Sequence, residues 1–143
     1  MSFVIDASVA IKWFIEENLS AEAGAILGHG EPLFAPDLLL AEIGNVLWKK
    51  VIRGEITRGQ AEVIVTALPD CLSRLWPSRE LAGRALALAF ALDHPVYDCL
   101  YLACAEATGG TLITADKRLH EAAGKAGFAA LVHPLGSPPA PPA

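Results

Sequence analysis

The chain has 143 residues, of which 53% are apolar, and its formal net charge at pH 7 is −5. This length fits one domain, and the acidic balance argues against a basic surface built for non-specific nucleic-acid binding. It does not exclude a nucleic-acid enzyme, because bound metal cations reverse the sign of the charge locally.

The first half of the chain is predicted to alternate between strands and helices. The apolar run from Phe3 to Asp6 is typical of a strand buried on both faces of a parallel sheet. Ser20 and Thr57 are expected to cap helices, and Pro36 is expected in the first turn of a long helix. The expected elements are a strand over 3–6, helices over 7–15 and 20–28, a strand over 31–35, and helices over 36–54 and 57–68.

The second half continues this alternation. Gly109 and Gly110 are expected to end a helix, because glycine readily adopts the backbone conformation that closes one. The expected elements are a strand over 73–76, helices over 79–92 and 96–108, a strand over 111–114, a helix over 117–126, and a strand over 129–132.

Strands that alternate with helices indicate a three-layer α/β/α sandwich around a largely parallel sheet of about five strands. The expected domain covers residues 1–133, and residues 134–143 are expected to form a proline-rich disordered tail. Ligands of such sheets bind beyond the carboxyl ends of strands, near the point where the strand order reverses. Asp6 and Asp116 follow two predicted strands and therefore have the expected position for a site.

The most apolar stretch, residues 81–92, contains Arg84 and is too short to span a membrane. The N-terminus lacks the pattern of a signal peptide. The three cysteines, an odd number without C-x-x-C spacing, suggest neither a disulfide framework nor a zinc site. A soluble protein of the reducing cytoplasm is therefore expected.

Four carboxylates, Asp6, Glu42, Asp98 and Asp116, fall where an α/β fold would gather them. Each also has a purely structural interpretation, because the three aspartates can cap or favour helix N-termini and Glu42 can face water. Like charges collected in one cleft repel, so such a cluster usually needs a divalent cation. The sequence therefore favours metal-dependent chemistry as the first hypothesis.

The same residues lie in four short segments with a specific order and spacing. These are Phe3-Val-Ile-Asp-Ala-Ser-Val-Ala10, Ala41-Glu-Ile-Gly-Asn-Val-Leu47, Tyr97-Asp-Cys-Leu-Tyr-Leu-Ala103 and Leu112-Ile-Thr-Ala-Asp-Lys-Arg-Leu119. Together they resemble the PIN-domain ribonucleases, particularly the VapC-type toxins of bacterial toxin–antitoxin pairs. The resemblance extends over nearly the whole chain and implies a PIN-like fold.

By position, the resemblance implies that Asp6, Glu42, Asp98 and Asp116 form an acidic quartet that binds Mg²⁺ or Mn²⁺. Mg²⁺ typically takes only one or two direct carboxylates, so Asp6 and Asp98 are expected to be direct ligands. Glu42 and Asp116 then act through water or complete a second site. The implied reaction is metal-assisted hydrolysis of an RNA phosphodiester, with Glu42 or Asp116 orienting or deprotonating the attacking water.

Four polar side chains are expected to support the site: Ser8, Thr114, Asn45 and Arg118. Ser8 and Thr114 place hydroxyls next to two of the carboxylates, although a helix cap and strand packing are the alternatives. Asn45 lies one turn from Glu42 and either hydrogen-bonds to it or is solvated. Arg118 and its neighbouring lysine contact substrate phosphate or form a solvated helix start.

The apolar fraction is high for a small monomer and indicates a surface covered by a partner. The resemblance implies a small VapB-type antitoxin, whose segment fills a hydrophobic groove, and a homodimer.

Two other classes of function remain open. One is a Mg²⁺-dependent phosphohydrolase or a phospho-accepting receiver domain, which also places an aspartate after the first strand. The chain lacks the D-x-D pattern of the former after Asp6 and the adjacent acidic pair of the latter. The other is a non-catalytic metal-binding interaction module, against which the four intact acidic positions argue.

Overall fold

A computed structural model describes residues 1–137 of the chain. Its centre is a five-stranded sheet in the order β3-β2-β1-β4-β5, and every pair of neighbouring strands is parallel. The parallel sheet expected from the sequence is therefore confirmed. The strands are β1 (Phe3–Ile5), β2 (Leu33–Pro36), β3 (Arg74–Trp76), β4 (Thr111–Thr114) and β5 (Val132–Pro134).

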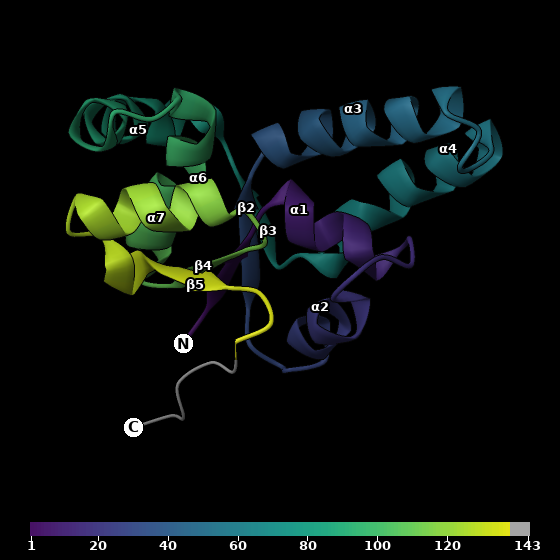
Figure 1. The fold of residues 1–143 in the computed structure, drawn as a ribbon, viewed down its shortest axis with the longest axis horizontal. Helices are drawn as coiled ribbons and strands as arrows, with labels where there is room; N and C mark the ends of the chain where they lie inside the picture. The colour runs from purple at the N-terminus through teal and green to yellow at the C-terminus, as the bar shows by residue number, and fades with distance from the viewer. Residues whose placement is uncertain (138–143) are drawn as a thin grey trace.

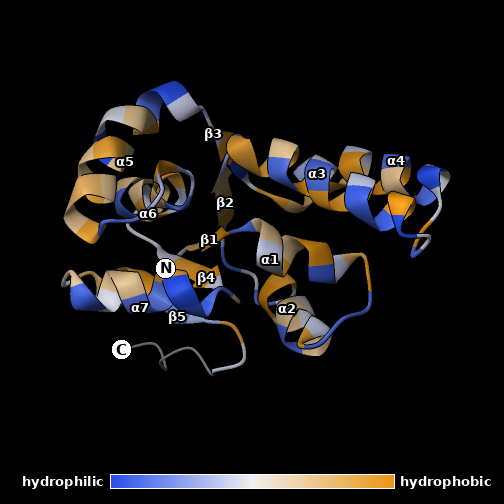
Figure 2. Cartoon of the chain, turned by 45° about the horizontal axis from the view of Figure 1, so that its top comes forward, coloured by the Kyte–Doolittle hydropathy of each residue, from blue (hydrophilic) through white to orange (hydrophobic). Residues whose placement is uncertain are grey.

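Helices cover both faces of this sheet (Figure 1). In Figures 1 and 2, α1 to α4 lie on one side of the strands and α5 to α7 on the other, so the expected three-layer α/β/α architecture is confirmed. The α-helices are α1 (Ala7–Ala10), α2 (Ser20–Leu27), α3 (Leu38–Ile52), α4 (Arg58–Ala67), α5 (Ser78–Leu92), α6 (Val96–Thr108) and α7 (Lys117–Lys125). Three short 3₁₀ helices are η1 (Ile11–Trp13), η2 (Leu68–Cys71) and η3 (Ala129–Leu131).

The core forms where the central strands meet α6. All three residues of β1 are buried, as the unbroken apolar run predicts for a strand covered on both faces. In α6, seven consecutive residues from Cys99 to Ala105 are buried, because this helix lies between the sheet and α5. Its position brings one helix face against β1, β2 and β4.

Two glycines end α6 and start β4. Gly109 has a φ of +66°, the left-handed conformation that closes a helix, as the sequence predicted. Gly110 approaches β1 so closely that a Cβ atom there would lie 2.7 Å from the carbonyl oxygen of Ser2. Only glycine therefore permits this approach between the starts of β1 and β4.

Several predicted boundaries are wrong. Pro36 ends β2 instead of opening α3, whose N-cap is Asp37, because the φ of proline suits a strand as well as a first helical turn. Ser20 does not cap α2: its hydroxyl accepts the N–H of Glu17 and donates to the carbonyl of Ile15, which stabilises the preceding turn. The last strand begins at Val132, after η3.

The fifth strand extends one residue past position 133, where the domain was expected to end. Pro134 belongs to β5, at the edge of the sheet, and the N–H of Leu135 donates to the carbonyl of Thr114 over 2.8 Å. Leu135 is buried. Residues 138–143 of the expected tail lie outside the described residues.

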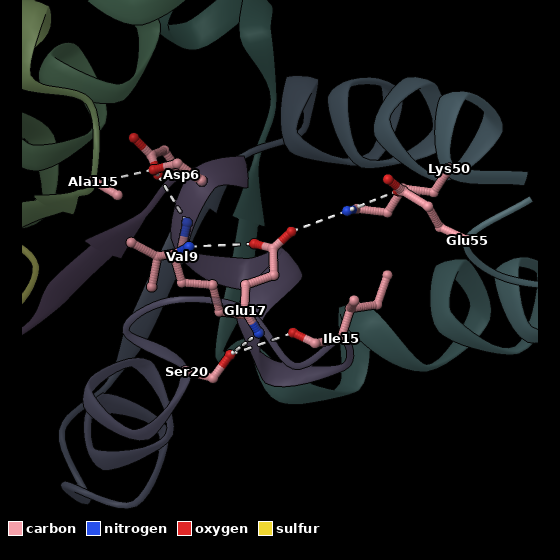
Figure 3. Close-up of polar contacts among 10 residues, drawn as sticks. Asp6, Val9, Ile15, Glu17, Ser20, Lys50, Glu55 and Ala115 are labelled. Carbon is pink, nitrogen blue, oxygen red and sulfur yellow. Dashed lines mark hydrogen bonds and ion pairs between the residues drawn. The ribbon is translucent and has the colours of Figure 1, made fainter. Parts of the chain in front are cut away.

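The hairpin of α3 and α4 extends from the sheet (Figure 1). An ion-pair chain anchors it, since Glu17 pairs with Lys12 over 3.2 Å and with Lys50 of α3 over 3.0 Å, while Lys50 also pairs with Glu55 (Figure 3).

Between residues 1 and 137, no helix is long and apolar enough to cross a membrane.

We expect Thr57→Ala to reduce the free energy of unfolding by about 1 kcal/mol, because Thr57 caps α4. Its hydroxyl accepts the N–H of Gln60, whose side chain accepts the N–H of Thr57 in return. Urea unfolding measures the change. Thr66→Ala, at an exposed position of the same helix, is the control and should cost nothing; an equal loss in both variants would contradict the capping role.

Candidate active site

The candidate site lies where the strand order reverses, between the carboxyl ends of β1 and β4. Asp6 follows β1, and Ala115 and Asp116 follow β4. Ser8 joins the two loops, because its hydroxyl donates to Asp6 Oδ1 over 2.5 Å and accepts the N–H of Ala115 over 3.0 Å. Figure 3 shows Asp6 and Ala115 side by side at this junction.

Asp6 is the most buried of the four expected carboxylates, with 8% of its surface exposed. It caps α1 by accepting the N–H of Val9 over 3.2 Å, so the helix-capping role considered for this residue is present. Burial raises the pKa of Asp6 from 3.8 to about 6; hydrogen bonds from Ser8, Thr114 and Val9 oppose this rise, and the charge of Asp98 adds to it. A capping role alone requires neither the burial nor the second carboxylate.

Glu42 reaches the same region from the second turn of α3. Tyr101 of α6 donates its hydroxyl to Glu42 Oε1. Burial raises the pKa of Glu42, the hydrogen bond from Tyr101 opposes the rise, and the charge of Asp98 contributes to it. Burial and the nearby carboxylates also raise the pKa of the Tyr101 hydroxyl, which therefore stays protonated and remains a donor.

Asp98 lies in the first turn of α6 and links the other two carboxylates, since its charge acts on both Asp6 and Glu42. His94 contacts it: Nε2 of the ring lies 2.6 Å from Asp98 Oδ2. A carboxylate accepts hydrogen bonds, so Nε2 carries the proton in this contact.

Asp116 occupies the adjacent loop. It caps α7 by accepting the N–H of Arg118 over 2.9 Å, and its own N–H donates to Thr114 Oγ1 over 3.0 Å. Of the charges described, Asp98 but not Asp116 acts on the pKa of Asp6 and of Glu42. The structure thus brings Asp6 and Glu42 each within electrostatic reach of Asp98, and it holds Asp116 in the adjacent loop through Thr114.

The expected supporting residues divide into two groups. Ser8 and Thr114 contact the carboxylates as described, and Thr114 is almost fully buried. Asn45 and Arg118 have exposed side chains. Within the described part of the chain, the side-chain hydrogen bond to Glu42 comes from Tyr101 and not from Asn45.

Two residues of the site, Tyr101 and His94, were missed by sequence reasoning. Tyr101 lies within one of the four matching segments, but the sequence alone indicated no role for it or for His94. The signal available for Tyr101 was its spacing from Asp98, since it lies three residues later, one turn along α6. His94 is four residues before Asp98 but precedes the helix, so helical spacing gave no such signal for it.

The donor set fits a hydrated divalent ion. Hard carboxylate oxygens suit Mg²⁺ and Mn²⁺. Burial is the main cause that raises the pKa of Asp6, the charge of Asp98 adds to it, and a bound cation would offset both. Among residues 1–137, however, no group of three or more His, Cys, Asp and Glu side chains is arranged ready to hold a metal ion. Mg²⁺ typically keeps several waters and takes only one or two protein carboxylates, so a site for it does not require three such side chains.

Comparison with known proteins matches residues 3–125 to the PIN domain family. Ribonuclease VapC3 of Pyrobaculum aerophilum is 33% identical over 136 residues, which cover 94% of this chain and 100% of that protein. Ribonuclease VapC1 of Mycobacterium tuberculosis is 38% identical over 123 residues, 85% of this chain and 90% of that protein. The crystal structure of PAE2754 from Pyrobaculum aerophilum shares the fold, with a TM-score of 0.68 and 24% identity over 85% of this chain and 79% of that one.

We expect Asp6→Asn to stabilise the metal-free protein more at neutral pH than in acid. The raised pKa means that the folded protein holds the Asp6 proton more tightly than the unfolded chain, so wild-type stability falls as pH rises from 3.8 to about 6. The gain from the substitution should be larger at about pH 7.5 than at about pH 4.5 by roughly 2 kcal/mol.

Urea unfolding in EDTA at the two pH values measures this difference. Asp70→Asn, at an exposed position of η2, is the control and should show no such pH dependence. A gain for Asp6→Asn that is equal at both pH values would show that burial does not penalise this carboxylate.

Proposed function

Because the chain belongs to the PIN-domain family, we propose that it is a divalent-metal-dependent endoribonuclease and the toxin of a toxin–antitoxin pair. The observation that carries this proposal is the convergence of Asp6, Glu42 and Asp98, from three separate elements, at the reversal point of the sheet. The relatives named ribonuclease VapC support it, since they align over most of the chain.

In this proposal Asp6 and Asp98 hold Mg²⁺ or Mn²⁺ directly, because their negative charges interact at the site and Asp6 is the most buried carboxylate there. The bound ion supplies Lewis acidity for the phosphate and lowers the pKa of a water. Glu42 accepts a hydrogen bond from the attacking water and orients it, because Tyr101 fixes one of its carboxylate oxygens. Asp116, held beside Thr114, acts through water or completes a second ion site.

RNA approaches from the open side of the β4–α7 loop in this proposal. Lys117 and Arg118 are exposed at the start of α7, directly after Asp116, and pair with no carboxylate in the described residues. Their charge suits contacts to the phosphates that flank the scissile bond. The match to the PIN family disfavours the phosphohydrolase, the receiver domain and the non-catalytic module.

The expected VapB-type antitoxin has a candidate site on the α3–α4 hairpin. A groove of about 470 Å³ lies there, lined mainly by apolar residues of both helices, among them Leu47, Val51 and Val65. Trp48 and Ile52 are 58% and 69% exposed at its edge. Figure 2 shows apolar residues recurring along both helices, and an amphipathic segment of a partner fits such a surface.

The expected homodimer has a different candidate surface. Leu86 and Phe90 lie one turn apart on α5 and are both exposed. Exposed Tyr97 lies in the first turn of the neighbouring α6. A second copy of the chain packed here would cover apolar area on α5 and α6, whereas the antitoxin groove lies on α3 and α4, so the dimer and antitoxin surfaces are separate in this proposal.

We expect Asp98→Asn and Asp6→Asn each to reduce RNA cleavage by at least about 100-fold, because each loses a charge needed to hold the ion. Cleavage of a mixed RNA pool by the purified protein with Mn²⁺ or Mg²⁺ is the measurement, with EDTA as the metal-free reference. Asp70→Asn is the matched control and should cleave like the wild type. Because Asp6→Asn is expected to fold more stably, lost cleavage in that variant cannot be attributed to unfolding; undiminished cleavage would exclude the proposed site.

We expect Trp48→Asp to weaken binding of the antitoxin by at least about 30-fold, the ~2 kcal/mol of a large aromatic contact. Calorimetric titration with the protein encoded beside this gene measures the affinity. Phe90→Asp introduces the same charge at an exposed aromatic position on α5 and should leave the affinity unchanged. The reverse pattern would place the antitoxin on α5 instead of on the hairpin.

A further inference from the structure

His94 has a fixed position in the connection between α5 and α6. Asp93 before it has a φ of +50°, and Pro95 after it is the N-cap of α6. The N–H of His94 donates to the carbonyl of Ala89 over 3.2 Å, and its carbonyl accepts the Cys99 thiol over 3.9 Å. Its backbone is thus held from both helices.

The ring of His94 is directed by this backbone onto the carboxylate of Asp98. Its side chain is 14% exposed, less than the 32% of Asp98, so the contact is partly shielded from water. Nε2 lies 2.6 Å from Oδ2, close enough for a direct hydrogen bond to the carboxylate. One of the two carboxylate oxygens of Asp98 is therefore occupied by the hydrogen bond to His94. The same bond fixes the direction in which the other oxygen points.

We propose that His94 is a positioning residue that holds Asp98 in the orientation needed to bind the divalent ion. This inference rests on the proposed function, and it adds a role for a residue outside the four acidic positions. Mg²⁺ and Mn²⁺ require closely defined ligand directions, and a carboxylate free to rotate loses affinity on binding them. Partners that hydrogen-bond to a ligand typically contribute about 10–100-fold to metal affinity or activity.

A purely structural role for His94 is the alternative, because the ring lies where α5 turns into α6. The two roles make different demands on the side chain. A structural role requires bulk in the turn, whereas positioning requires an N–H that reaches Oδ2 of Asp98. Substitutions that separate bulk from hydrogen bonding therefore distinguish them.

His94→Leu keeps bulk without a donor, and His94→Gln keeps a donor in its amide. We expect His94→Leu to weaken Mn²⁺ binding by about 10–100-fold in calorimetric titration of the full chain. We expect His94→Gln to recover most of the wild-type affinity. The midpoints of thermal unfolding in EDTA should be close to the wild-type value for both variants, because the lost contact serves the ion and not the fold.

Arg84→Met is the matched control for the packing of α5 on α6. Arg84 pairs with Glu106 across the same two helices, with distances of 2.7 and 2.9 Å, away from the carboxylates. This variant should bind Mn²⁺ like the wild type. Unchanged or tighter binding by His94→Leu, or equal weakening by His94→Gln, would overturn the positioning role.

Parallel RNA cleavage assays separate this inference from the proposed function. If the wild type binds Mn²⁺ in a His94-dependent manner but cleaves no RNA, the positioning role stands and the ribonuclease proposal fails. If it cleaves RNA while His94→Leu binds Mn²⁺ normally, the ribonuclease proposal stands and the positioning role fails. A wild type that binds no Mn²⁺ contradicts both.

Discussion

Burial of negative charge at the reversal point of the sheet is the constraint on which the site depends, because burial is the main cause that raises the pKa of Asp6 and of Glu42, and the charge of Asp98 adds to both. Keeping Asp6 ionised in its buried position at neutral pH costs about 3 kcal/mol, as its pKa of about 6 implies. Burial of a single leucine contributes about 1.5–3 kcal/mol, so one or two side chains of the α6 core offset that cost. The apolar α6 is thus what allows the sheet to carry charge at its reversal point.

The carboxylates of the site share one arrangement. In Glu42, Asp98 and Asp116, the hydrogen bonds within residues 1–137 all reach a single oxygen of the carboxylate. One oxygen is used to fix the side chain, and the other remains as an acceptor. A structural role and metal binding are therefore compatible in these residues. One carboxylate oxygen can accept the structural hydrogen bond while the other binds an ion. The donors are Tyr101 for Glu42, His94 for Asp98 and the backbone of Arg118 for Asp116.

Residues that start or end a helix through their own backbone explain which elements the sequence could predict. The bounds of α6 agree with the prediction because Pro95 and Gly109 act on their own neighbours. Pro36 was misplaced because its φ suits both a strand end and a first helical turn, and only its pairing with Trp76 of β3 decides between them. The residues that follow strands were predictable as a site because parallel strands end at one edge.

The partners of the carboxylates were less predictable, for a physical reason. Tyr101 and Glu42 are 59 residues apart, and their contact exists only once α3 and α6 are placed against the sheet. His94 is close to Asp98 in sequence, but Pro95 separates it from the helix, so helical spacing did not point to it. Sequence patterns thus located the charged groups, whereas the neutral groups that orient them depend on the packing of whole helices.

The absence of a side chain at Gly110 allows β1 and β4 to lie close together at the end of the sheet opposite the carboxylates. β1 and β4 are paired in register from Phe3 and Thr111 onward, and they are only three and four residues long. A methyl group at position 110 would push the two strands apart at Ser2, which lies four residues or about 13 Å before Asp6, given the ~3.3 Å rise of each residue. The close approach at Gly110 therefore helps to set the distance between the two loops that Ser8 bridges, although it lies at the opposite end of the strands from the carboxylates.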